Sequence, residues 1–181
     1  MLKNKKIPLP SQLKTNRTIL TPLQEKDLHA VKNIFQEKET VRWLETPTLN
    51  KDQVKEVIQQ KIDNENTITY TATTRATQKK IGLIELTNID TRNQKAHIGY
   101  ILRKQYWGRG YATELVHTVT KNAFKHLYRL TAHIHAGNTA SMNVLEKNNY
   151  QEEGILQDNV IINNNRHDTY IYAALKPRWE Q

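Results

Sequence analysis

The sequence predicts an α/β fold of the α+β kind, with strands and helices in the order β-α-α-α-β-β-β-α-β-α-β-β. The first observation is that the spacing of apolar residues changes along the chain. Residues 67–102 hold three strand-like runs separated by short polar turns, as in an antiparallel meander. The second is that segments on both sides of this meander repeat apolar residues at helical spacing. The third is the length, because 181 residues fit one domain with room for a hydrophobic core.

The part of the chain before the meander is predicted to be mainly helical. A short β-branched strand over residues 17–21 ends at Pro22. Apolar spacing then predicts helices over residues 25–36 and 51–63, and Asn50 is a good N-cap for the second of these. A shorter helix over residues 39–45 would lie between them.

The meander and the remaining chain supply the other elements. Strands are predicted over residues 67–74, 80–86 and 96–102. They are followed by a long helix, a strand, a second helix and two final strands, over residues 111–127, 129–136, 138–148, 150–156 and 169–175. The asparagine run at residues 163–165 predicts a loop between the last two strands.

The charge is positive but dispersed. The chain has 27 Lys and Arg against 18 Asp and Glu, a formal net charge of +9. Residues 1–16 hold four lysines, two prolines and no acid, so we expect a flexible basic segment ahead of a domain over residues 17–179. No nucleic-acid-binding motif accompanies the charge, and direct nucleic-acid binding is not expected. Contact with an acidic partner such as a ribosome stays open.

The absence of cysteine excludes several classes of protein. Disulfide scaffolds, Cys-ligated zinc, iron–sulfur clusters and a cysteine nucleophile are ruled out. No apolar run approaches the roughly 20 residues that span a bilayer, and the basic start has no apolar signal-peptide region. We therefore expect a cytoplasmic protein without a membrane partner.

One turn suggests a ligand. Gly108 and Gly110 lie between the third meander strand and the long helix, where they allow a tight turn. Backbone N–H groups entering a helix N-terminus bind anions, so a phosphate or pyrophosphate is the expected ligand. Thr113 excludes the G-x-G-x-x-G pattern, and the spacing is not that of a P-loop. A plain capping turn would also place glycines here.

Three ordered motifs resemble one family. Gln105-x-x-Gly108-x-Gly110 resembles the Q/R-x-x-G-x-G/A signature of the GCN5-related N-acetyltransferases (GNAT). Residues 138–150 resemble that family's N-x-x-S-x-x-v-x-E-K-x-G-F segment. Residues 97–100 resemble the E-I-G-Y strand of its RimJ/RimL branch, which acetylates the N-terminal residue of ribosomal proteins.

This resemblance covers about residues 16–179 and implies a fold and a co-substrate. The sheet would be mixed, mostly antiparallel, six- to seven-stranded and splayed between the fourth and fifth strands, with about four to five helices. Acetyl-CoA would lie across the opening. Its pantetheine arm would contact Ile101, Leu102 and Arg103. Its pyrophosphate would be held by backbone N–H groups of the turn, at Gln105, Gly108, Arg109, Gly110, Tyr111 and Ala112, and the side chain of Arg109 would add a positive charge. Asn138, Ser141 and Asn143 would reach the cofactor from the next helix. Arg109 as a solvated side chain, Asn138 as a simple cap and Asn143 as an ordinary helix residue remain alternatives.

The implied reaction is direct attack of an amine on a thioester, which needs a base and, for the leaving thiolate, an acid. Ser141 matches the position of the acid in the RimL type. His97, His133 and Glu85 are the candidate bases, with water or a purely structural role as alternatives. A backbone N–H on the splayed strand would stabilise the oxyanion. His133 and His135 share a strand face, but no third ligand is evident, so no metal is expected.

The acceptor site is implied to lie between the first helices and the last hairpin. Trp43, Leu44, Pro47, Glu85 and the segment 163–168, which contains His167, are the candidate acceptor residues. The predicted acceptor is an N-terminal α-amine, as on a ribosomal protein. Acidic residues Glu37, Glu39 and Glu45 keep a polyamine or aminoglycoside acceptor open. A non-catalytic RNA- or ribosome-binding module and a homodimer are also left open.

Overall fold

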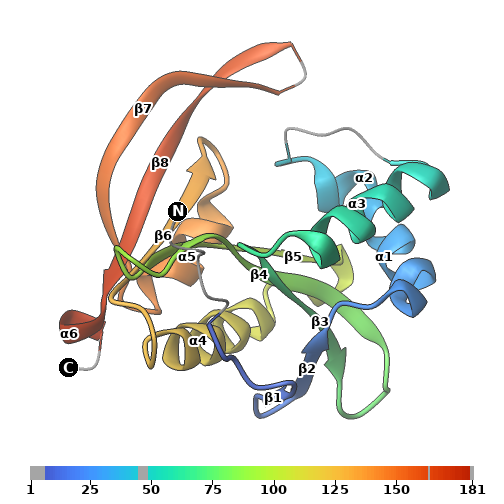
Figure 1. The fold of residues 1–181 in the computed structure, drawn as a ribbon. Coiled ribbons are helices and arrows are strands. Elements are labelled where there is room, and N and C mark those ends of the chain that lie inside the picture. The colour runs from blue at the N-terminus through green and yellow to red at the C-terminus, as the bar shows by residue number, and fades with distance from the viewer. Residues whose placement is uncertain (1–6, 45–48, 163, 180–181) are drawn as a thin grey trace.

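A computed structural model of the chain describes residues 7–44, 49–162 and 164–179. They form an eight-stranded sheet in the order β1-β2-β3-β4-β5-β6-β8-β7 (Figure 1). The pairs are antiparallel except β5–β6, which is parallel. The strands are β1 Leu13–Lys14, β2 Thr18–Pro22, β3 Ile68–Thr74, β4 Lys80–Asp90, β5 Lys95–Leu102, β6 Arg129–His135, β7 Gln151–Ile162 and β8 Asn165–Leu175.

Helices cover both faces of this sheet. The helices are α1 Leu28–Phe35, α2 Lys38–Val41, α3 Lys51–Asp63, α4 Tyr111–Ala123, α5 Thr139–Glu146 and α6 Lys176–Trp179, with 3-10 turns at Glu25–Asp27 and Lys104–Tyr106. Helices α1–α3 lie on one side, and α4 and α5 on the other (Figure 1). The predicted Asn50 cap is confirmed, because its side chain accepts from the N–H groups of Asp52 and Gln53.

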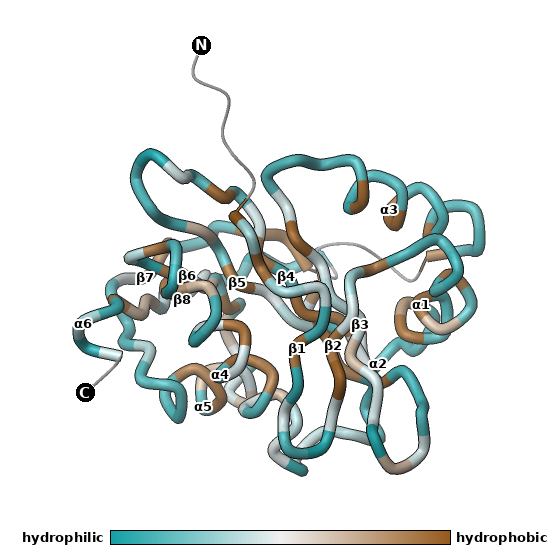
Figure 2. Tube along the Cα trace, turned by 60° about the horizontal axis from the view of Figure 1, so that its bottom comes forward, coloured by the Kyte–Doolittle hydropathy of each residue, from teal (hydrophilic) through white to brown (hydrophobic). Residues whose placement is uncertain are grey.

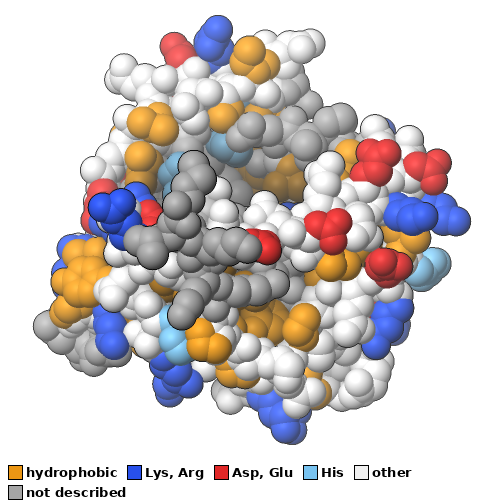
Figure 3. All heavy atoms as spheres, viewed as in Figure 1, with side chains coloured by type: hydrophobic (Ala, Val, Ile, Leu, Met, Phe, Trp, Pro, Cys, Tyr) orange, Lys and Arg blue, Asp and Glu red, His pale blue; other side chains and the backbone are white. Residues whose placement is uncertain are grey.

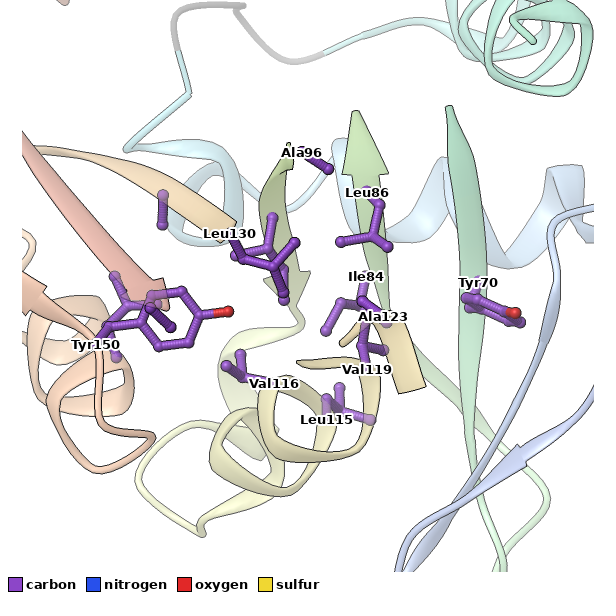
Figure 4. Close-up of a cluster of buried hydrophobic side chains, with 14 of the residues drawn as sticks. Tyr70, Ile84, Leu86, Ala96, Leu115, Val116, Val119, Ala123, Leu130 and Tyr150 are labelled. Carbon is purple, nitrogen blue, oxygen red and sulfur yellow. The ribbon is translucent and has the colours of Figure 1, made fainter. Parts of the chain in front are cut away.

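Each face of the sheet has its own hydrophobic core. On one face, Leu115 and Val119 of α4 pack toward Ile84 and Leu86 of β4 (Figure 4). On the other face, α1 and α3 pack on Leu83 of β4 and on Ile101, its neighbour in β5. Apolar residues run along the central strands, whereas the connections are mostly hydrophilic (Figure 2). Alternate residues of one strand therefore face different helices.

The N-terminal segment differs from the prediction. Residues 13–14 pair with β2 and add an eighth strand to the six or seven expected. Ile7 and Leu13 are buried, and the hydroxyl of Tyr70 donates to the carbonyl of Pro10 over 2.7 Å. The apolar side chains of Ile7 and Leu13 therefore hold these two residues against the sheet, and the flexibility of the segment as a whole stays a prediction. Residues 1–6 lie outside the described residues.

The last hairpin is longer than the sequence predicts. β7 and β8 pair as far as Ile162↔Asn165, although the register shifts between Leu156 and Val160. Most of β7 is exposed, so it has no half-buried alternation that would indicate a strand. The hairpin rises from the sheet and arches toward α2 and α3 (Figure 1).

Two smaller predictions also change. The helix expected over residues 39–45 is the shorter α2, and Glu45 and Pro47 lie outside the described residues. Of the predicted 163–165 loop, Asn163 is likewise not described, and Asn165 belongs to β8. Within the described ranges, no helix has the length and apolar composition to cross a membrane.

Candidate active site

The sheet opens between β5 and β6. The two strands pair over only three residues, ending at His97↔Thr131. Beyond that point β5 continues beside β4 to Leu102, and β6 continues beside β8 to His135. The strands therefore diverge toward their carboxyl ends, which confirms the splay predicted between the fourth and fifth strands.

Backbone groups of β5 face this opening. The N–H of Arg103 donates to the carbonyl of Ile81 over 2.9 Å. Because backbone groups of an antiparallel strand alternate in direction, those of Ile101 also point toward β4, and those of Tyr100 and Leu102 point into the opening. A ligand there can use the backbone of Tyr100 and Leu102 but not of Ile101 or Arg103, where backbone contacts were also expected.

The glycine turn follows β5. Gly108 and Gly110 have φ of 68° and 78°, in the left-handed region that side chains other than glycine rarely adopt. Gly110 is the residue before α4, so the first N–H groups of that helix are free of helical partners. A Cβ on Gly108 would meet nothing within 4 Å. The turn thus offers backbone donors and a helix N-terminus beside open space, which suits a phosphate.

Arg17 holds this turn from a distant part of the chain. Its Nη2 donates to the carbonyl of Arg109 over 2.8 Å, and its Nε donates to Glu114 over 2.7 Å. The guanidinium also lies 4.2 Å from the ring centroid of Tyr111. Arg17 therefore fixes the turn that was predicted to bind pyrophosphate. Sequence analysis missed it, because no local pattern links residue 17 to residue 109.

Glu85 lies on the face covered by α1–α3. It pairs with Gly99 in the β4–β5 register, and a Cβ on Gly99 would lie 3.8 Å from Glu85 Oε1. Oε2 accepts from Lys61 Nζ at 2.5 Å and from Thr69 Oγ1 at 3.2 Å. One carboxylate oxygen is thus held by α3 and β3, while the other lies over the glycine of β5.

Two of the predicted bases lie together. The rings of His97 and His133 are 4.9 Å apart between centroids, at the point where β5 and β6 separate. Burial, and then the charges of His133 and Lys95, lower the pKa of His97 below its ordinary 6.5. His97 is consequently neutral at pH 7, and its imidazole can accept a proton.

Ser141 and Asn138 lie at the start of α5. The side chain of Asn138 accepts from the N–H of Ser141 over 3.3 Å, which confirms Asn138 as the cap of this helix. The hydroxyl of Tyr100 donates to the carbonyl of Ser141 over 3.3 Å, and burial raises the pKa of Tyr100 to about 12. Tyr100 therefore links β5 to α5 in its protonated form. Asn143 is exposed.

An outer groove joins two predicted acceptor residues. It has a volume of about 320 Å³ and is lined by Arg42, Trp43, Ile162, Asn165 and His167. It lies between the end of α2 and the tip of the β7–β8 hairpin. Figure 3 shows histidine and hydrophobic side chains beside a hollow on this face. Trp43 and His167, 124 positions apart, are thus brought to one groove.

Comparison with known proteins identifies the family. The model of the acetyltransferase (GNAT) domain matches residues 17–151. The chain belongs to the GNAT family of N-acetyltransferases. The "Uncharacterized N-acetyltransferase YoaA" of Bacillus subtilis is 28% identical over 172 residues, covering 92% of this chain and 97% of its own.

Other GNAT proteins are similar to this chain in part or in fold. "Putative ribosomal N-acetyltransferase YdaF" of Bacillus subtilis is 36% identical over 101 residues, which is 55% of each chain. The solved spermidine N-acetyltransferase of Vibrio cholerae, in complex with CoA and spermine, superposes with a TM-score of 0.83. It is 20% identical, and the match covers 91% of this chain and 98% of that one, so it shows the shared fold.

Three of the described acidic side chains near the opening of this GNAT domain form ion pairs. Glu37 lies 3.8 Å from Arg103, Glu39 lies 3.3 Å from Arg42, and Glu85 is bound by Lys61. Glu45, the other acidic acceptor candidate, lies outside the described residues. Among the residues that the structure describes, no group of three or more His, Cys, Asp or Glu could hold a metal ion.

Proposed function

We propose that this GNAT enzyme transfers the acetyl group of acetyl-CoA to the α-amine at the N-terminus of a polypeptide, as expected of the RimJ/RimL type. The observation that carries this choice is the pairing of Glu37, Glu39 and Glu85 with cations. A single ammonium can be met by the remaining oxygen of Glu85, whereas a polyamine would need several unpaired carboxylates. The cytoplasm is our predicted location for this reaction.

The glycine turn is where acetyl-CoA would bind. The N–H groups between Gly108 and Ala112, with the dipole of α4, suit the pyrophosphate, and Arg109 adds a positive charge. The inward-facing backbone of Tyr100 and the N–H of Leu102 suit the amides of the pantetheine arm, while the carbonyl of Leu102 accepts from Trp107. The solved CoA complex of the Vibrio cholerae enzyme, which has the same fold, supports CoA as the co-substrate.

His97 would act as the base. Glu85 holds the incoming ammonium, and the neutral imidazole of His97 accepts a proton from it. The free amine forms a C–N bond with the thioester carbonyl carbon, and the oxyanion is stabilised by an N–H of β5. The nitrogen, still carrying one extra proton, loses it to water as the C–S bond breaks. The thiolate of CoA takes a proton from water, or from Ser141, which then regains one from water.

The weakness of this base also favours an α-amine. A chain N-terminus has a pKa of about 7.7–8.0, whereas a lysine-like primary amine has one of about 10.4. A histidine whose pKa lies below 6.5 can deprotonate an N-terminal ammonium far more readily than a lysine-like ammonium, because the difference in pKa is smaller. The name of YdaF, a putative ribosomal N-acetyltransferase, supports a ribosomal acceptor.

Polyamine acetylation is the second candidate. It is supported by the fold shared with the spermidine enzyme and opposed by the paired carboxylates. Purified protein would be screened with acetyl-CoA against peptides beginning Ala, Ser or Met, beside spermidine, spermine and an aminoglycoside. We expect a kcat/KM at least about tenfold higher for a peptide, which is about 1.4 kcal/mol of transition-state binding. Faster spermidine turnover would overturn the choice, and no turnover with any amine would favour a non-catalytic module.

A further inference from the structure

The two arms of the opening end in two connections. The β5 arm leads into Arg103, Lys104 and the glycine turn, and the β6 arm leads through Gly137 into Asn138 at the start of α5. β5 and β6 form no ladder pair beyond His97↔Thr131. Residues 37–43, which contain α2, touch both connections, and we call them the bridge segment.

The bridge segment is fastened to the β5 arm by polar contacts. The N–H of Lys104 donates to Glu37 Oε2 over 2.9 Å and to Thr40 Oγ1 over 3.2 Å. The guanidinium of Arg42 lies 5.6 Å from the ring centroid of Trp107. The indole N–H of Trp107 in turn donates to the carbonyl of Leu102 over 2.6 Å. The segment is thus connected to a strand residue whose N–H faces the opening.

Trp43 makes the contact with the β6 arm. A Cβ on Gly137 would lie only 2.9 Å from Cη2 and 3.3 Å from Cζ3 of the Trp43 ring, so the ring packs where a side chain would stand. The next residue, Asn138, caps the helix that carries Ser141. Movement of this connection would therefore move the indole.

The same side chains line the outer groove. Arg42 and Trp43 line it together with His167 of the hairpin, and the guanidinium of Arg42 lies 5.1 Å from the ring centroid of Trp43. One wall of the groove is therefore made of residues that contact both arms of the opening.

We propose that Arg42 and Trp43 couple the CoA site in the opening to the outer groove, which would bind the acceptor. Acyl-CoA in the opening would fix the distance between the two arms. This would hold the Trp43 ring in place and complete the wall of the groove. Trp43 is then a positioning residue in addition to a groove residue. The proposal rests on CoA binding in the opening, as in the proposed function, but not on the identity of the acceptor. It predicts that CoA and acceptor each bind about fivefold or more tightly in the presence of the other.

Hydrogen exchange on the full chain tests the coupling without an acceptor. Addition of CoA should slow amide exchange in residues 37–43 as well as at the glycine turn. In Trp43→Ala the turn should still be protected, but the protection of the bridge segment should be lost. Trp43→Phe keeps an aromatic ring and should retain most of the protection of the bridge segment. This variant is the control for a loss of protection caused by misfolding. Unchanged exchange in the bridge segment on CoA addition, or equal protection in Trp43→Ala, would overturn the proposal.

A second measurement uses the acceptor peptide that the amine screen selects. The affinity of CoA, titrated with and without saturating acetylated product peptide, should differ about fivefold in the wild type and less than twofold in Trp43→Ala. Equal affinities in the wild type would contradict the coupling. If no amine is acetylated, the proposed function fails, while CoA-induced protection of residues 37–43 would still support the bridge.

Discussion

Lys61 of α3 holds Glu85 of β4 at 2.5 Å, and this contact leaves the second carboxylate oxygen of Glu85 beside Gly99 of β5. Both side chains are largely shielded, at 23% exposure each. Lys61 binds only one of the two oxygens of the Glu85 carboxylate. The other oxygen lies beside β5, one of the two strands that border the opening, and we propose that it binds the acceptor ammonium.

Glu85→Gln tests this role. Losing the negative charge while keeping the shape should lower kcat/KM for a peptide acceptor about tenfold to hundredfold, with the CoA affinity unchanged. The matched control is Glu153→Gln, which removes another ion-paired carboxylate, bound by Arg129 at the hairpin base, and should leave kcat/KM unchanged. Equal rates for wild type and Glu85→Gln would remove Glu85 from the acceptor site.

The pH dependence tests His97 as the base. Protonated imidazole cannot accept a proton, so kcat/KM should fall as the pH drops through a pKa that burial and the charges of His133 and Lys95 hold below 6.5. His97→Gln should lose this acid limb and about a hundredfold in rate. In His133→Gln the limb should shift upward, toward 6.5, because a neighbouring charge is gone. An unchanged acid limb in His97→Gln would assign the base to another group.

Gly108→Asp tests the phosphate site. Since a Cβ at this position meets nothing within 4 Å, the carboxylate would enter the space assigned to the pyrophosphate and repel it. Gly108→Asn is the matched control, because Asn has the same shape without the charge and tolerates the φ of 68°. CoA should raise the melting temperature of wild type and Gly108→Asn, but not of Gly108→Asp. Similar shifts in both variants would place the pyrophosphate elsewhere.

Arg17→Ala tests the support of the turn. Losing the bond to the carbonyl of Arg109 and the pair with Glu114 should weaken CoA binding about tenfold by calorimetric titration. Arg75→Ala is a neighbouring control, since Arg75 donates to the carbonyl of Asn16 and does not contact the turn. If both variants bind CoA like the wild type, Arg17 is not a support of the cofactor turn.

Local patterns predicted much of the fold and the position of the glycine turn before α4. The alternating runs of β3–β5, the apolar stripe of α4 and the Asn50 cap are encoded within a few residues of each other. Asn149, which stands where the second motif has glycine, has a left-handed φ of 59°, a conformation that Asn adopts more readily than most residues.

Contacts between distant segments could not be predicted in this way. The contact between the tilted rings of His97 and His133 depends on the β5–β6 register, and the link from Arg17 to Arg109 depends on how the turn between β1 and β2 lies beside α4. Leu13 lies in a segment whose prolines and lysines suggest flexibility, although its own apolar side chain is buried against the sheet. The pairing of Glu85 with Lys61 likewise joins elements that show no sequence relation.

The preference for an α-amine can be tested with one peptide that carries both an α-amine and a lysine side-chain amine. A peptide beginning with Ser and containing an internal Lys would be incubated with the enzyme and acetyl-CoA, and fragment masses would locate the acetyl group. We expect acetylation of the α-amine, with the lysine side chain unmodified. Acetyl transfer to the lysine with a free α-amine would contradict this preference.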